Sequence, residues 1–108
     1  MTVYVDDMRR PAQVGRTHGS WSHLFADTSD ELHAFAARLG LRREWLQHEG
    51  THREHYDVTE RKRQAAIAYG AQQISYPRGT ADLLNRKNAA AMRDMQREHT
   101  DALDGGEG

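Results

Sequence analysis

Predicted β-strands alternate with predicted helices along this chain. Of all its sequence features, this alternation constrains the fold most. Residues 2–6 and 21–26 are rich in β-branched and aromatic residues, which predicts two strands. Two more strands are predicted over 44–47 and 71–76, the last one stopped by Pro77. With helices between them, the order β-β-α-β-α-β-α indicates an α/β class, one small domain of two or three layers with a mostly parallel sheet.

The segment 27–41 predicts the first helix. Thr28 and Glu31 form a capping box, and Gly40 suits the left-handed position after the last turn. One buried stripe is indicated by apolar residues at helical spacing, namely Leu32, Phe35, Ala36 and Leu39.

Two further helices are expected downstream. Asp57 or Thr59 caps the second, which ends at Gly70, and Thr80 caps the third, which continues to about His99. The connections over 7–20 and 48–55 show no periodicity, so we interpret the first as a mobile loop and the second as a charged connection. We expect a single domain over residues 1–100, with the third helix over 80–99 and a disordered tail over 101–108.

The composition excludes several classes of function. The net charge of the 108-residue chain is −1, which gives no overall attraction to nucleic acid or to an anionic membrane, so neither is a favoured partner. The chain has no cysteine, which excludes disulfides, thiolate zinc sites and cysteine nucleophiles. The opening MTVYVDDMRR has the pattern of neither a signal peptide nor a membrane span, and we expect a cytoplasmic protein.

Several motifs resemble a known family. VYVDDMR, WSHLFADTSDELHAFAARLGL, the W-x-Q at 45–47 and HYDVTERKRQAAIAYGA together are similar to the domain of unknown function 4031 family. The resemblance covers about residues 1–76 and leaves the third helix outside. It implies a free-standing accessory protein of a bacterium or bacteriophage, and it assigns no catalytic residue.

His55 and Asp57 are the first candidate catalytic pair. Side chains two residues apart in an extended segment point the same way, so the carboxylate could fix the imidazole for general-base catalysis or for metal binding. The alternatives are a helix cap for Asp57 and an exposed loop position for His55.

His23 is the third candidate catalytic residue, and Asp6 and Asp27 are candidate metal ligands. His23 shares a strand face with Trp21 and Phe25, where a hydrogen-bonded core residue is the alternative. Asp6 is the last residue of one predicted strand, and Asp27 follows another. If the strands are parallel, these groups converge, and they then suit a divalent metal such as Mg²⁺, Mn²⁺ or Zn²⁺, or a metal-free acid–base pair.

Lys62 and Arg63 are the candidate phosphate-binding residues. Cations in the first turn of a helix oppose its dipole, whereas an anion held there would meet free N–H groups and both cations. The alternative is that Glu60 and Asp57 neutralise the turn and the cations are solvated.

The other histidines have simpler interpretations. We expect His33 to flank the apolar stripe of the first helix in a surface or boundary position, and His48, His52 and His99 to lie on the surface. The glycine-containing stretch with Arg16 and His18 matches no phosphate-binding motif and is interpreted as a flexible loop.

Two hypotheses of function follow. The first is an enzyme that binds or acts on a phosphate-containing ligand, a nucleotide or a nucleic-acid end, by His/Asp acid–base or metal-assisted chemistry. The second is a non-catalytic protein that forms a homodimer or binds a host protein through its third helix, which has only a thin apolar stripe (Leu84, Asn88, Ala91, Met92 and Met95).

Overall fold

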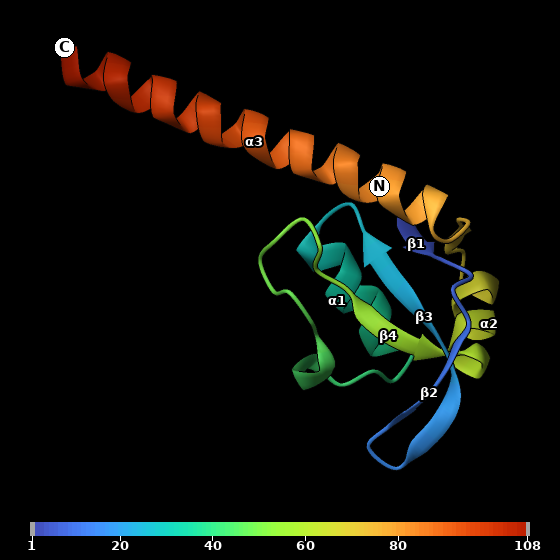
Figure 1. The fold of residues 1–108 in the computed structure, drawn as a ribbon. Helices are drawn as coiled ribbons and strands as arrows, with labels where there is room; N and C mark the ends of the chain where they lie inside the picture. The colour runs from blue at the N-terminus through green and yellow to red at the C-terminus, as the bar shows by residue number, and fades with distance from the viewer. Residues whose placement is uncertain (1, 108) are drawn as a thin grey trace.

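The computed structural model describes the backbone of residues 2–107 and the side chains of residues 2–96. Figure 1 shows a sheet with helices on both faces and one helix that extends far beyond the rest. The elements in chain order are β1 Val3–Val5, β2 Arg10–Val14, β3 Thr17–Ala26, α1 Ser29–Arg38, the 3₁₀ helix η1 Arg43–Trp45, β4 Tyr56–Thr59, α2 Glu60–Ala68, β5 Gln72–Gln73 and α3 Arg78–Glu107.

The long strand β3 is the centre of a five-stranded mixed sheet. It pairs antiparallel with β1 and β2 along one edge and with β4 along the other, and only β1 and β5 are parallel. The small α/β domain is confirmed, but the mostly parallel sheet is not. The alternation of strands and helices misleads here because β2, β3 and β4 are antiparallel neighbours, which need no helical crossover between them.

The segment 7–20, predicted as a loop, contains β2 and the first part of β3. The two strands form a hairpin whose turn includes Gly15, with a φ of +60°. All five residues of β2 are exposed. A strand that buries neither face shows no alternation of apolar and polar residues, which explains why the sequence gives no strand signal there.

The two faces of the sheet bury different residues. Val5, Leu24 and Val58 pack on one face against α1 and α2, in a cluster that also holds Leu32 and Ala66. The opposite face forms a smaller cluster of Tyr4, Phe25 and Leu83, and this face is covered by the first turns of α3. The domain therefore has three layers, and α3 covers only part of its face.

The helix ends agree with the sequence for α1 and only partly for α2 and α3. The side chain of Thr28 accepts from the Glu31 amide at 3.2 Å, and Gly40 has a φ of +77°, as predicted. Thr59, not Asp57, caps α2. Because α3 begins at Arg78, Thr80 lies within the helix rather than at its cap.

Two of the predicted strands are shorter or absent. The segment 44–47 forms most of η1, and only Gln47 makes an isolated bridge, with His55. The strand predicted over 71–76 is reduced to Gln72–Gln73. These runs are too short for the periodicity of side chains to separate a strand from a turn.

The C-terminal helix gives the molecule its elongated shape. The extents of the molecule are 58 × 27 × 25 Å, and α3 leaves the body along the longest direction (Figure 1). The backbone of α3 continues to Glu107, beyond the end expected at about His99. Side chains are not described there, so the disorder predicted over 101–108 and the surface position predicted for His99 stay predictions. Among the described residues, no helix combines the length and apolar character needed to cross a bilayer.

The connection between η1 and β4 is fixed to α1 by a buried carboxylate. Glu54 is 4% exposed, and it accepts a hydrogen bond from the Ser29 hydroxyl at 2.6 Å and another from the Gly50 amide at 3.0 Å. Burial opposes ionisation of Glu54, but these two bonds, with the charges of His33 and Lys87, outweigh it and lower its pKa below the usual 4.5. The ionised form therefore holds this loop in place.

We predict that Glu54→Gln lowers the free energy of unfolding by about 1–3 kcal/mol at pH 7, because the amide cannot accept both bonds. Since the folded-state pKa of Glu54 is lowered, its contribution is present above pH 4.5 and is lost as the pH falls through the folded pKa. Urea unfolding of both proteins at several pH values measures this. A difference that stays constant down to acidic pH contradicts it.

Candidate functional site

A bulge between β1 and β2 creates the centre of the site. Both strands pair with the same edge of β3, and residues 6–9 leave the ladder between them. The Asp6 amide still bonds the His23 carbonyl at 3.1 Å, and the Arg9 amide bonds the Ser22 hydroxyl at 3.0 Å, with Arg9 at a φ of +48°. The bulge brings the Asp6 side chain beside His23.

The Asp6 carboxylate is fully buried and fully bonded. It accepts from the His23 ring Nδ1 at 2.7 Å, the His23 amide at 2.9 Å, the Thr80 hydroxyl at 2.9 Å and the Met8 amide at 3.3 Å. Burial opposes its ionisation, but the bonds from His23 and Thr80 outweigh burial and lower the pKa of Asp6. Asp6 thus stays ionised, and as a pure acceptor it requires His23 Nδ1 to carry a proton.

His23 is held in one tautomer by this bond. With Nδ1–H donating to Asp6, the neutral ring keeps a lone pair at Nε2. Burial disfavours the charged ring, but the hydrogen bond and charge of Asp6, with the charge of Asp57, raise the pKa of His23 above its usual 6.5. Nε2 is therefore a basic nitrogen available to a ligand or a proton.

His55 is anchored in the same way from the neighbouring strand. Its Nδ1 lies 2.7 Å from the Arg53 carbonyl, and because a carbonyl only accepts, Nδ1 must donate. The Nε2 atom then faces the Asp57 carboxylate at 3.4 Å. Asp57 is the cross-strand partner of His23, and Gln47 donates to its other oxygen.

His23, His55 and Asp57 form the one group of possible metal ligands within the described residues. One ligand atom from each lies within 4.8 Å of the others. Each imidazole is fixed at Nδ1, by a carboxylate or a carbonyl, which leaves Nε2 as the nitrogen that could bind a metal. Supporting partners of this kind are typical of metal-binding histidines, and two histidines with one carboxylate are a known set for divalent transition metals.

A cavity of about 320 Å³ opens beside the two histidines. It lies between β3, the segment before β4, and the start of α3, and its lining residues are His23, Phe25, Arg53, His55, Tyr76, Pro77, Thr80, Ala81 and Leu84. This volume is at the lower end of the usual range for small-molecule sites.

The arrangement differs from the predicted acid–base pair. His55 and Asp57 point the same way, as expected, but Nδ1 of His55 is occupied by a backbone carbonyl and Nε2 faces Asp57. Both ring nitrogens of His55 therefore already face a partner, and neither is free to abstract a proton from a substrate. The geometry of a supported general base belongs instead to His23, which Asp6 holds by one nitrogen while the other stays available.

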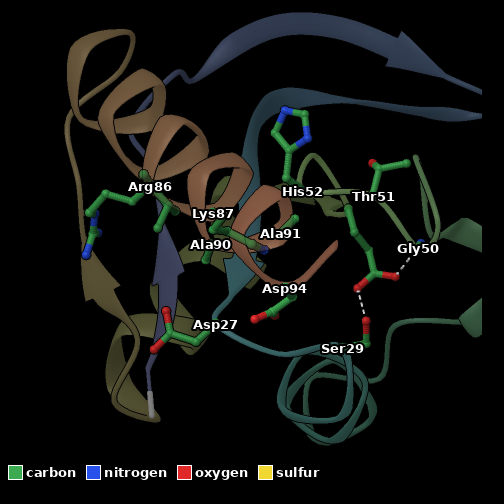
Figure 2. A pocket seen from close by; sticks show the side chains of 12 residues that line it. Asp27, Ser29, Gly50, Thr51, His52, Arg86, Lys87, Ala90, Ala91 and Asp94 are labelled. Carbon is green, nitrogen blue, oxygen red and sulfur yellow. Dashed lines mark hydrogen bonds between the residues drawn. The ribbon is translucent and has the colours of Figure 1, made fainter. Parts of the chain in front are cut away.

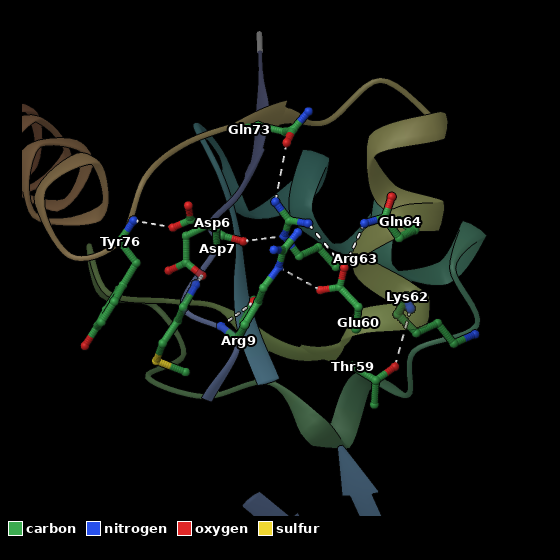
Figure 3. Close-up of polar contacts among 12 residues, drawn as sticks. Asp6, Asp7, Arg9, Thr59, Glu60, Lys62, Arg63, Gln64, Gln73 and Tyr76 are labelled. Atoms are coloured by element: carbon green, nitrogen blue, oxygen red, sulfur yellow. Dashed lines mark hydrogen bonds and ion pairs between the residues drawn. The ribbon is translucent and has the colours of Figure 1, made fainter. Parts of the chain in front are cut away.

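Lys62 and Arg63 both have partners within the fold, and Figure 3 shows those of the Arg63 guanidinium. The Lys62 ammonium donates to the Leu39 carbonyl at the end of α1. Arg63 is 3% exposed, and its Nε donates to the Asp6 carbonyl at 2.8 Å. Both positions give these cations structural roles, and neither residue lines the cavity beside His23. Their phosphate-binding role stays a prediction.

Asp27 lies apart from the histidine cluster. Its carboxylate accepts from the Tyr4 hydroxyl at 2.8 Å and the Thr2 amide at 3.0 Å. It lines a different cavity, of about 450 Å³, between α3 and the start of α1 (Figure 2). There Lys87 donates to the Ala26 carbonyl at 2.6 Å, and burial lowers its pKa. The predicted metal role of Asp27 gains no geometric support.

The remaining histidines lie largely where the sequence placed them. His33 is half-buried beside the apolar stripe of α1, and its Nδ1 lies 3.2 Å from the Tyr56 hydroxyl. His48 is exposed and its ring stacks on His55, with centroids 5.7 Å apart. His52 is half-buried at the second cavity, and His18 is exposed in the hairpin rather than in a loop.

The sequence reasoning missed several residues of the site. Arg53 and Tyr76 line the cavity, Gln47 orients Asp57, and Thr80 supports Asp6. Gln47 stands in the W-x-Q motif, which was a usable signal. Arg53 lies in the non-periodic connection 48–55 and Tyr76 at the end of the strand predicted over 71–76, and only the tertiary fold brings them to the histidines.

These observations define a small α/β domain with a His–His–Asp cluster at a cavity. The chain belongs to the family described as "Protein of unknown function (DUF4031)", which matches residues 3–90. The match extends beyond the predicted 1–76 into α3. No curated protein and no solved structure matches the chain.

We predict that Asp6→Asn lowers the free energy of unfolding by about 3 kcal/mol or more, because an amide cannot accept from four donors in a buried site. Chemical denaturation measures the loss. The exposed Asp82→Asn is the matched control and should change stability by less than about 0.5 kcal/mol. Equal stability of both variants contradicts the role of Asp6.

Proposed function

We propose that this chain is a divalent-metal-dependent hydrolase that acts on a small phosphate-containing ligand. The observation that carries the proposal is the convergence of His23, His55 and Asp57, with one ligand atom of each within 4.8 Å of the others. A divalent metal held by these three side chains would lower the pKa of a bound water and polarise a phosphoryl oxygen.

The contacts around the three residues favour a metal over a proton relay. In the neutral form, the lone pair of His55 Nε2 and an Asp57 oxygen face each other at 3.4 Å, and a cation between acceptors removes their repulsion. Three supporting groups, namely Asp6, the Arg53 carbonyl and Gln47, hold the cluster from outside. An ordinary surface histidine needs no such support.

The ligand atoms of the three side chains discriminate among Mg²⁺, Mn²⁺ and Zn²⁺, the metals expected from the sequence. Two imidazole nitrogens and one carboxylate suit Zn²⁺, and less well Mn²⁺, whereas Mg²⁺ prefers an all-oxygen shell. Zinc is therefore the metal that we propose, and three protein ligands leave a coordination position for water or substrate.

Arg53 supports an anionic substrate. It lines the cavity, and within the described residues its guanidinium takes part in no ion pair. A guanidinium matches the oxygens of a phosphate, which is the ligand class expected from the sequence. Hydrolysis would join a water oxygen to phosphorus and break the P–O bond to the leaving group, and one water proton would pass to the leaving oxygen.

We expect zinc to bind the purified chain with one-to-one stoichiometry in a calorimetric titration. His55→Ala and Asp57→Ala each remove a ligand, so the affinity should fall by more than the roughly 10–100-fold typical of losing a supporting group. His18→Ala, in the exposed hairpin, is the control and should bind as the parent does.

The same proteins test the reaction. The zinc-loaded parent should release phosphate from an aryl phosphate ester, the Asp57 variant should not, and Arg53→Gln should keep zinc affinity while losing most of the turnover. Zinc affinity that is equal in the parent and both ligand variants would refute the proposed site.

A second candidate function rests on α3. Met92 and Met95 are 57% and 68% exposed, on the part of the helix that leaves the body and lies beyond the family match at residue 90. Exposed apolar side chains on a projecting helix suit contact with a second copy or another protein. Light scattering over a concentration series separates the two: a strong dimer that binds neither zinc nor phosphate esters favours this candidate.

A further inference from the structure

The cavity beside the histidines has one polar end and one apolar side. His23, His55 and Arg53 form the polar end. The other walls are Phe25, Tyr76, Pro77, Ala81 and Leu84, which come from β3, the segment before α3 and the first turns of α3. A phosphate group alone would occupy the polar end and leave the apolar side facing water.

Aromatic rings continue directly from the proposed ligands into this apolar side. The ring of Phe25 lies 5.5 Å from His55 and 5.7 Å from His23, centroid to centroid. The Tyr76 ring lies 5.8 Å from His23 and is tilted against it by 38°. The Tyr76 backbone is held by its amide, which donates to Asp7 at 2.6 Å (Figure 3).

Few polar groups remain on this side to bind a polar body. The Thr80 hydroxyl already donates to Asp6. The Asp6 carboxylate itself is 0% exposed. A sugar bearing several hydroxyls would lose its hydrogen bonds with water and gain few in return, whereas a flat apolar ring would lose none.

We infer that the substrate carries a flat, largely apolar aryl ring close to its phosphate. The phosphate faces Arg53 and the two histidines, and the ring packs between Tyr76, Pro77 and Leu84. This inference rests on the proposed function for the position of the phosphate. It adds the identity of the group next to the phosphate, which the metal ligands do not determine.

The test uses phosphonates, whose C–P bond is not hydrolysed. Phenylphosphonate and methylphosphonate are titrated by calorimetry into the full chain, both zinc-loaded and metal-free. Ala81→Leu fills the apolar side at an exposed helical position, and Ala89→Leu makes the same change on α3 away from the cavity. Leucine is a good helix former, so both variants should fold.

We expect phenylphosphonate to bind the parent at least about tenfold more tightly than methylphosphonate, because only the former buries a ring. Ala81→Leu should remove that preference while methylphosphonate still binds, and Ala89→Leu should keep it. Equal binding of both phosphonates, or a preference that survives in Ala81→Leu, overturns the inference.

The outcomes also separate the two proposals. If the chain binds zinc and binds both phosphonates with equal affinity, the inference of a substrate ring is overturned and the proposed metal site stands. If the chain binds no zinc but prefers phenylphosphonate, the proposal of a zinc-dependent hydrolase is overturned, and the inferred site for the ring is supported. Absence of any phosphonate binding overturns the inference whatever the metal does.

Discussion

The buried carboxylate of Asp6 is the interaction on which the rest of the structure depends. Its oxygens bind the ring and amide of His23 on β3 and the hydroxyl of Thr80 on α3, while its carbonyl receives the buried Arg63 of α2. Three elements, β3, α2 and α3, therefore meet at one residue. A buried charge destabilises the fold unless it is fully paired, so each of these partners contributes to stability. The same pairing orients His23, whose Nε2 stays available at the cavity.

The two histidines are fixed by different means, and together they explain why a cluster forms on this face. Alternation along β4 sends Tyr56 and Val58 into the core and leaves His55 and Asp57 on the opposite face, beside His23. Because α3 covers that face only in part, the cluster lies at a cavity. The apolar face that stabilises the fold and the polar face that carries the candidate chemistry are thus two sides of the same strands.

How much of this could be predicted depends on whether the signal was local. The α1 cap, the shared direction of His55 and Asp57, and the position of Asp6 after a strand are properties of a few adjacent residues, and the structure contains all three. The antiparallel pairing of β3 with β4 joins residues far apart in the sequence, so no local pattern predicts it. Asp27 was expected to converge with the histidines if the strands were parallel; its carboxylate bonds Tyr4 and Thr2 instead, and its metal role stays a prediction. Thr80 was interpreted as a cap because threonine before an apolar run has that pattern; its actual partner lies 74 positions away.

We propose that His23 and His55 bind a metal through Nε2 while Nδ1 of each ring stays protonated. Long-range ¹H–¹⁵N spectra of the imidazole rings, recorded with and without one equivalent of Zn²⁺, measure this binding mode. We expect the Nε2 resonances of these two histidines to shift on zinc addition, their Nδ1–H signals to persist, and the other rings to stay unchanged. Zinc-induced changes confined to other histidines, or no change at either ring, would contradict it.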